Sequence, residues 1–149
     1  MKDGLRTVLI LMAEDDPDDR LLTEEALKEA HLQNEIHFVE DGMELLDYLY
    51  RRGKYGDNGN VRRPGIILLD LNMPRMDGRE ALEIIKNDEE LRRIPIVVLT
   101  TSRAEEDILR SYDLGVSGYI PKPVTLEDLI SIMRTLGRYW FEIVELPPE

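Results

Sequence analysis

The feature that most constrains this chain is a run of four aliphatic residues, 66–69, that leads directly into Asp70. A continuous apolar run of this length is typical of a strand covered on both faces, as in a parallel sheet. Pro74 blocks simple extension of the strand, and the spacing of Asp77 and Glu80 is typical of a helix N-terminus. We therefore expect Asp70 at the mouth of a central strand, on a short loop before a helix. In open α/β sheets that edge is where ligands bind.

Length and composition favour one domain. A chain of 149 residues is long enough to bury a proper core, and it contains no cysteine for a disulfide, a thiol nucleophile or a Cys-type metal site. The N-terminus lacks the apolar segment of a signal peptide, and no apolar run approaches the roughly 18 residues of a membrane span. The formal charge of −12 argues against DNA or anionic membrane as a main partner. We expect a single cytoplasmic domain with a core over 7–140 and a C-terminal extension over 141–149.

Five apolar runs alternate with amphipathic helical patterns. The expected strands cover 7–13, 36–39, 66–69, 95–99 and 116–120. The expected helix starts are Asp16-Pro17, Asp41, Asp77, Ser102 with Glu105, and Thr125 with Asp128. Repetition of strand then helix, with right-handed crossovers, predicts an α/β fold: a parallel sheet with helices on both faces.

The connections are less regular. The first helix is expected to run to about residue 32, and Gly115 is a natural C′ residue for the fourth. Residues 51–64 show no periodicity and are expected to form a loop. Its five basic residues are either solvated or a contact for a partner kinase: Arg51, Arg52, Lys54, Arg62 and Arg63. The charged run 88–93 is interpreted as a solvated helix end and connection.

Side chains with chemistry follow four of the expected strands. They are Glu14-Asp15, Asp70, Thr100-Thr101 and residues 119–122. Each alone has an ordinary explanation as a cap, a turn residue, a strand former or a core residue. A parallel sheet, however, brings all four strand ends to one edge, where three carboxylates would repel one another and raise one another's pKa. Oxygen ligands without Cys or His favour Mg²⁺, or Mn²⁺, as the cation that relieves this repulsion.

This group of residues suits phosphoryl transfer to an aspartate. A carboxylate at an open sheet edge can act as a nucleophile and form an acyl phosphate. Positive charge and hydrogen-bond donors must then meet the phosphoryl oxygens. The expected roles are Asp70 as phosphoacceptor, Glu14, Asp15, Asp70 and the backbone carbonyl of Asn72 as metal ligands, and Lys122 and Thr100 as the groups that receive the phosphoryl group.

The chain resembles the response-regulator receiver domains of two-component signalling. The resemblance rests on Glu14-Asp15, 69–78, 100–102 and 118–123, and it covers about 7–140. It implies a CheY-like flavodoxin fold, a five-stranded sheet in the order 2-1-3-4-5. It also implies a phospho-switch rather than an enzyme, driven by a sensor histidine kinase that phosphorylates the aspartate.

The resemblance implies three further features of the site. Tyr119 is an aromatic switch that moves with Thr100, and the Lys122–Pro123 bond is cis, which aims the lysine. Glu14 stands where many members have Asp, so its longer side chain can reach the metal through a water.

Within this family the chain most resembles the stand-alone regulators of bacterial and cyanobacterial phytochrome kinases. That likeness rests on residues 46–53, the long loop after them and the tail 139–147. It implies a phytochrome-type kinase as partner, no output domain, and a homodimer. The tail residues expected at the dimer interface are Trp140, Phe141, Ile143 and Leu146. The alternative is that this tail folds back on its own domain.

Two other functions stay open. The first is a binding module that works without phosphorylation, a pseudo-receiver. The second is a phosphatase of the haloacid-dehalogenase type, which also uses an aspartate at a strand end. That chemistry needs a second acid two residues after the nucleophile, and this position is Asn72.

Overall fold

The computed structural model describes residues 8–56, 61–122 and 125–138. Five parallel strands form one sheet in the order β2-β1-β3-β4-β5. The strands are β1 (Ile10–Ala13), β2 (Ile36–Val39), β3 (Ile66–Leu69), β4 (Ile96–Thr100) and β5 (Gly118–Pro121). The α-helices are α1 (Pro17–Glu29), α2 (Gly42–Tyr50), α3 (Gly78–Lys86), α4 (Glu105–Leu114) and α5 (Leu126–Leu136). The predicted fold class and strand order are confirmed.

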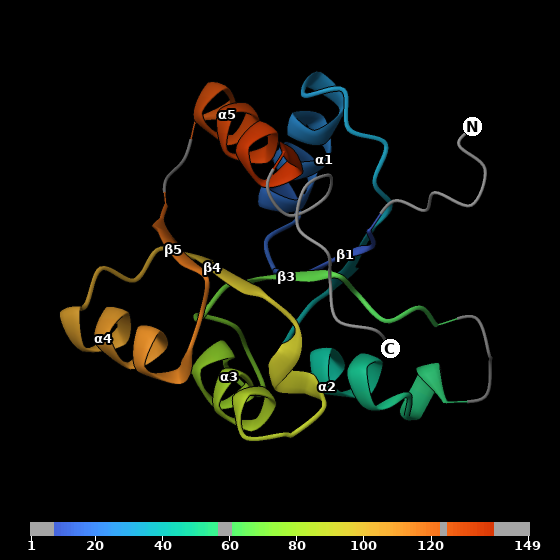
Figure 1. Cartoon of the computed structure of the whole chain (residues 1–149), viewed down its shortest axis with the longest axis vertical. Coiled ribbons are helices and arrows are strands. Elements are labelled where there is room, and N and C mark those ends of the chain that lie inside the picture. Colours follow the sequence, from blue (N-terminus) through green and yellow to red (C-terminus); the bar gives the residue numbers. More distant parts are fainter. Residues whose placement is uncertain (1–7, 57–60, 123–124, 139–149) are drawn as a thin grey trace.

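Helices cover both faces of the sheet. Figure 1 shows α1 and α5 side by side on one face, and α2, α3 and α4 on the other. Successive strand residues enter opposite cores, as the pleat requires. Leu11 and Ile67 pack in the core that includes α2 and α3, whereas Ile10 and Ile66 pack in the core that includes α1 and α5. Both cores bury the aliphatic run before Asp70, as the sequence predicted.

Four of the five predicted helix starts are confirmed. The side chains of Asp16, Asp41, Asp77 and Thr125 each accept a hydrogen bond from a backbone N–H in the first turn of the helix that follows. Such caps satisfy donors that the helix itself leaves unpaired. They fix where each helix leaves the carboxyl edge of the sheet.

The predicted cap at Ser102 is wrong. Helix α4 begins at Glu105, and the residue at its N-cap position is Ala104, which makes no side-chain capping hydrogen bond. The Ser102 hydroxyl instead donates to Oδ2 of Asp107 at 2.6 Å. The serine is therefore drawn to a charged acceptor inside the helix, and the loop before α4 is longer than expected. Gly115 does adopt the left-handed conformation at the end of α4, with φ of 98°.

The first helix ends earlier than predicted. It stops at Glu29, and His31 follows with a left-handed φ of 60°. The N–H of His31 bonds to the carbonyl of Lys28, and the N–H of Leu32 bonds to the carbonyl of Leu27, both at 3.0 Å. This is a Schellman ending, which usually carries Gly or Asn at the left-handed position. A histidine there gave no recognisable stop signal.

Residues 51–64 are more ordered than predicted where they are described. A 3₁₀ turn, η1 (Gly53–Tyr55), places Tyr55 in a buried position against the rings of His37 and Tyr48. Three of the basic residues form ion pairs within the chain: Arg52 with Asp47 and Lys54 with Glu44, each at 2.9 Å, and Arg62 with Glu35 at 3.1 Å. The loop therefore packs against β2 and α2 through aromatic rings and salt bridges.

Other boundaries shift by a few residues. Strand β1 begins at Ile10 rather than residue 7, and β5 begins at Gly118 rather than residue 116. The charged run 88–93 contains a second 3₁₀ turn, η2 (Leu91–Arg93), whose leucine is buried.

Some predicted features lie outside the described residues. These are Pro123 and the tail residues Trp140, Phe141, Ile143 and Leu146. Across 8–56, 61–122 and 125–138, no helix is long and apolar enough to cross a membrane.

Candidate phosphoryl-acceptor and metal site

The ends of β1 and β3 bring the first acids together. Ala13 and Leu69 are register partners, so the residues that follow them, Glu14 and Asp70, leave neighbouring strands at the same level. The loop after Asp70 closes tightly because of Gly78. A Cβ at this position would lie 2.2 Å from the carbonyl oxygen of Asp70, which only glycine avoids. The sequence thereby holds Asp70 at the carboxyl edge of the sheet.

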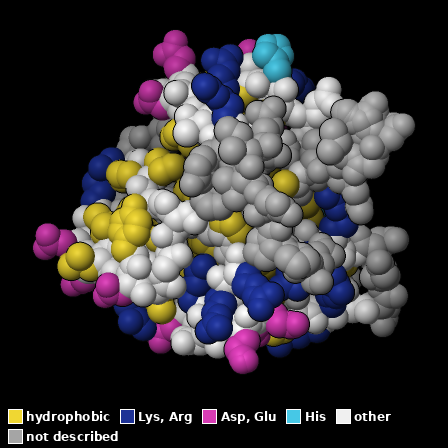
Figure 2. All heavy atoms as spheres, viewed as in Figure 1, with side chains coloured by type: hydrophobic (Ala, Val, Ile, Leu, Met, Phe, Trp, Pro, Cys, Tyr) yellow, Lys and Arg dark blue, Asp and Glu magenta, His cyan; other side chains and the backbone are white. Residues whose placement is uncertain are grey.

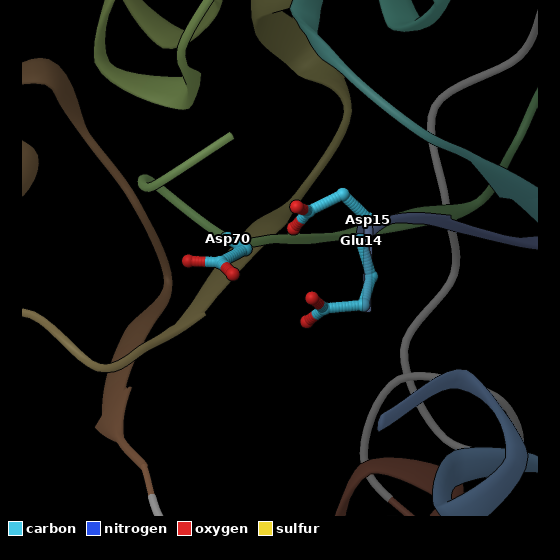
Figure 3. A group of neighbouring side chains, drawn as sticks. All are labelled: Glu14, Asp15 and Asp70. Atoms are coloured by element: carbon cyan, nitrogen blue, oxygen red, sulfur yellow. The ribbon is translucent and has the colours of Figure 1, made fainter. Parts of the chain in front are cut away.

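Three carboxylates converge at this edge. Oxygen atoms of Glu14, Asp15 and Asp70 lie within 4.8 Å of one another. Figure 3 shows the side chains of Glu14 and Asp15 leaving the end of β1 in different directions and both turning towards Asp70. Glu14 and Asp70 are buried, and Asp15 is exposed.

This donor set fits a hard divalent cation. Opposite ligands of an octahedral Mg²⁺ with bonds of about 2.1 Å lie about 4.2 Å apart. The three carboxylates are therefore close to that spacing, and a small movement or a bridging water would complete it. Two buried carboxylates side by side are costly without a cation, whereas carboxylate oxygens are the ligands that Mg²⁺ and Mn²⁺ prefer.

Lys122 is buried between three carboxylates. Its ammonium donates to Oε1 of Glu14 at 2.5 Å, to Oδ2 of Asp19 at 2.9 Å and to Oδ2 of Asp70 at 3.4 Å. Its backbone is fixed as well, because its N–H donates to the carbonyl of Thr100 at 2.7 Å. The lysine is thus placed beside the predicted phosphoacceptor.

The charges of this group are coupled. Burial raises the pKa of Glu14 to about 7, and the hydrogen bond from Lys122 only partly offsets it. Burial alone would lower the pKa of Lys122, but the hydrogen bonds to Asp19 and Glu14 outweigh burial and raise that pKa above its ordinary value. The lysine therefore stays protonated at neutral pH.

Both predicted switch residues contact Ser102. The Thr100 side chain is buried, and its hydroxyl oxygen accepts from the N–H of Ser102 at 3.3 Å. Tyr119 is half-buried, and its hydroxyl donates to the carbonyl of Ser102 at 3.1 Å. A change at Thr100 can therefore reach Tyr119 through one shared loop residue.

The other side of Asp70 holds a second polar network. The N–H of Asn72 donates to Oδ1 of Asp70 at 3.0 Å. The Asn72 carboxamide donates to Thr101 and accepts from Arg79 at 3.1 Å. Arg79 also makes two hydrogen bonds, of 2.8 and 2.7 Å, to the two oxygens of Asp107. An asparagine tied in this way has no carboxyl to act as a general acid, which removes the basis for a dehalogenase-type phosphatase.

The structure brings the predicted residues together, with some exceptions. Glu14, Asp15, Asp70 and Lys122 lie in one group. Thr100 lies next to that group through the backbone of the lysine. The backbone carbonyl of Asn72 as a metal ligand stays a prediction.

Three residues of the site were missed in the sequence. Arg79 and Asp107 gave no signal, because their pairing depends on how α3 and α4 pack. Asp19 did give one. It lies four and seven residues before Thr23 and Ala26, which are buried, so it continues the inward stripe of α1. A carboxylate on such a stripe indicates a buried partner.

Comparison with known proteins adds independent support. Residues 10–134 match the response regulator receiver domain family. The chain is 42% identical over 139 residues to the response regulator Rcp1 of Synechocystis sp., covering 93% of this chain and 92% of that protein.

Two solved structures are similar along almost the whole chain. The Mn²⁺-bound form of Rcp1 is 41% identical with a TM-score of 0.83, covering 95% of this chain and 99% of that one. The phosphorylated cyanobacterial phytochrome response regulator RcpA is 43% identical with a TM-score of 0.85, covering 96% of this chain and 100% of that one.

Proposed function

Since the chain belongs to the response regulator receiver domain family, we propose that it is a phosphorylation switch whose acceptor is Asp70. The observation that supports this best is the position of Lys122, whose ammonium lies 3.4 Å from Oδ2 of Asp70 beside two further carboxylates. A cation on one side of a carboxylate and an acidic group on the other suits acceptance of a phosphoryl group.

The proposed step is an in-line transfer from a phosphohistidine. An oxygen of Asp70 attacks phosphorus, an O–P bond forms, and the P–N bond breaks. The imidazole nitrogen keeps the electron pair and takes up a proton. Lys122 neutralises one phosphoryl oxygen and the Thr100 hydroxyl donates to another.

We assign Glu14, Asp15, Asp70 and the backbone carbonyl of Asn72 to a divalent cation, with Mg²⁺ as the cellular ion. The similar regulator Rcp1 has a solved Mn²⁺-bound form. When bound, the ion supplies positive charge that reduces repulsion between the phosphoryl group and the carboxylates.

The phosphoryl group then shifts the equilibrium between the inactive and active conformations of the chain towards the active one. Switching a mostly inactive ensemble almost completely requires roughly 5 kcal/mol of differential stabilisation. New charge-assisted hydrogen bonds from Lys122 and Thr100 to the phosphoryl oxygens are the proposed source. Tyr119 follows because it shares Ser102 with Thr100, and the face formed by α4, β5 and α5 changes shape. The chain would act as a switch in the cytoplasm, where histidine kinases draw on ATP.

We propose a phytochrome-type histidine kinase as the partner. The support is the likeness to a phosphorylated phytochrome response regulator along nearly the whole chain. The test is phosphotransfer from such a kinase to this chain, compared with transfer from an unrelated histidine kinase. Equal rates with both would contradict the assignment.

We also propose a homodimer through the tail residues Trp140, Phe141, Ile143 and Leu146. Truncation after Arg138 should give a monomer in sedimentation analysis. A truncated chain that still dimerises would overturn this part.

The central assignment is tested by intact mass. The chain is incubated with Mg²⁺ and acetyl phosphate, beside Asp70→Asn and a sample with EDTA. One added phosphoryl group in the first sample alone supports Asp70 as a metal-dependent acceptor. No adduct on a folded wild-type chain would contradict it and favour a binding module that works without phosphorylation.

A further inference from the structure

Asp19 is a partner of Lys122 that the phosphoryl chemistry does not use. Its Oδ2 lies 2.9 Å from the lysine ammonium, closer than the 3.4 Å between that ammonium and Asp70. Its side chain is 33% exposed, whereas that of Glu14 is 1% exposed. Asp19 lies in the first turn of α1, whereas Asp70 follows β3. The ion pair with Asp19 therefore draws the lysine towards α1 rather than towards the predicted phosphoacceptor.

Asp19 also stands apart from the acidic group that fits a cation. Among the described residues, the carboxylates that gather within 4.8 Å are Glu14, Asp15 and Asp70. A cation there competes with Lys122 for Glu14 and Asp70. Of the three carboxylates that contact Lys122, Asp19 is therefore the one that lies outside the metal site.

Packing leaves room for the lysine to move. A cavity of about 80 Å³ lies beside the pair, bounded mainly by Met12, Leu22, Leu99 and Leu129. Because one side of the contact is not tightly filled, van der Waals packing does not by itself fix the lysine. The charge contacts do so instead.

We propose that Asp19 is a positioning residue that anchors Lys122 in the unphosphorylated chain. The lysine must leave this anchor to bind the phosphoryl group, so Asp19 sets how readily the site accepts one. The proposal rests on the proposed function, because it describes the resting state of the same site.

The ordinary alternative is that Asp19 only stabilises the N-terminus of α1 as an acid in the first turn. Asp18 provides the matched control for this. It lies in the same turn and carries the same charge, but it is exposed, and no contact joins it to Lys122 in the described structure. Asp18→Asn therefore removes a helix-end charge without removing the anchor.

The test measures binding of beryllofluoride, a phosphoryl mimic, to the full chain with saturating Mg²⁺. Titrations followed by ¹⁹F NMR compare wild type, Asp19→Asn, Asp19→Glu and Asp18→Asn. Asp19→Asn should bind the mimic about threefold more tightly, the equivalent of losing one partly exposed ion pair from the resting state. Asp19→Glu keeps a carboxylate within reach and should bind like wild type, as should Asp18→Asn.

A second arm places Asp19→Asn on a Lys122→Ala background. The gain from Asp19→Asn should vanish there, because no lysine remains to be anchored. Persistence of the gain, an equal gain in Asp18→Asn, or no gain in a folded Asp19→Asn chain would each overturn the proposal.

A metal-binding measurement without the phosphoryl mimic tests whether Asp19 is itself a metal ligand. Mn²⁺ affinity should fall in Asp15→Asn and stay near wild type in Asp19→Asn. An equal loss in both would make Asp19 a metal ligand and overturn the anchor. Failure of the proposed function would look different, since wild type itself would bind no beryllofluoride and take no phosphoryl group from acetyl phosphate.

Discussion

The two sides of Asp70 hold their charges in different ways. On the side of α1 and α5, the cation is Lys122, buried among the carboxylates of Glu14, Asp19 and Asp70. On the side of α3 and α4, the cation is Arg79, whose guanidinium makes paired hydrogen bonds to Asp107 and whose side chain is 39% exposed.

The difference shows which side can move. An ammonium is a point charge with three rotatable donors, so it can exchange one oxygen for another. A guanidinium paired with both oxygens of one carboxylate has a fixed geometry. We therefore interpret the lysine side as the exchangeable part of the switch and the arginine side as a frame that ties α3, Asn72 and α4 together.

The largest expected effect comes from removing the exchangeable cation. Lys122→Ala should still accept a phosphoryl group at Asp70, but the phosphorylated chain should not switch, because the main charge that recognises the phosphoryl group is gone. Hydrogen exchange of α4 and β5, with and without acetyl phosphate, measures this. A normal phosphorylation-dependent change in the variant would refute the role of the lysine.

The same substitution should also destabilise the metal-free chain. Three carboxylates would then face one another without a cation, and breaking a buried ion pair costs about 3 kcal/mol. Urea unfolding of Lys122→Ala should show this loss, and Mg²⁺ should restore part of it by replacing the missing charge. Lys28→Ala, at an exposed lysine of α1, is the control and should change little. A loss that Mg²⁺ does not reduce would argue against a shared cation site.

A smaller effect is expected on the arginine side. The hydrogen bond from Arg79 lowers the pKa of Asp107 below its ordinary value of 3.8. A carboxyl whose pKa is lower in the folded state than in the unfolded state stabilises the fold at pH values above its unfolded-state pKa. That contribution is lost as the pH falls through the folded-state pKa. Asp107→Asn should therefore cost about 1 kcal/mol at neutral pH. The gap between the two urea curves should close below about pH 4. A gap that is constant with pH would show that the charge of Asp107 contributes nothing.

The smallest expected effect is the response to salt. Raising salt from 0.1 to 1 M shortens the Debye length from about 10 to about 3 Å. The coupling between Arg79 and Asp107 in a double-mutant cycle should fall to a few tenths of a kcal/mol, because the pair is only partly buried and salt can screen it. The coupling between Lys122 and Glu14 should stay nearly constant, because both groups are buried. If the two coupling energies fell equally with salt, the lysine side and the arginine side of Asp70 would not differ as proposed.

The parts of the fold that depend on local pattern were predicted from the sequence. The aliphatic run before Asp70 determined a doubly covered strand, and cap residues such as Asp16 and Thr125 marked helix starts. The common edge of a parallel sheet then predicted that Glu14, Asp70 and Lys122 would meet.

The parts that depend on distant partners could not be predicted. Asp19 pairs with a lysine 103 positions away along the chain. The Ser102 side chain does not cap α4, because its hydroxyl donates to the carboxylate of Asp107, which is a stronger acceptor. Tyr55 is ordered by rings from β2 and α2 rather than by its own neighbours. In each case the local sequence allowed several outcomes, and tertiary packing selected one.

The most direct test of this account is a crystal structure of the chain with Mg²⁺ and beryllofluoride. The account predicts that the Lys122 ammonium moves from Glu14 and Asp19 to a fluorine of the mimic, at a hydrogen-bond distance of about 3 Å. It also predicts that Arg79 and Asp107 keep their paired hydrogen bonds. A lysine that remains on Glu14 and Asp19 while the mimic sits on Asp70 would contradict the central claim that Lys122 is the exchangeable cation of the switch.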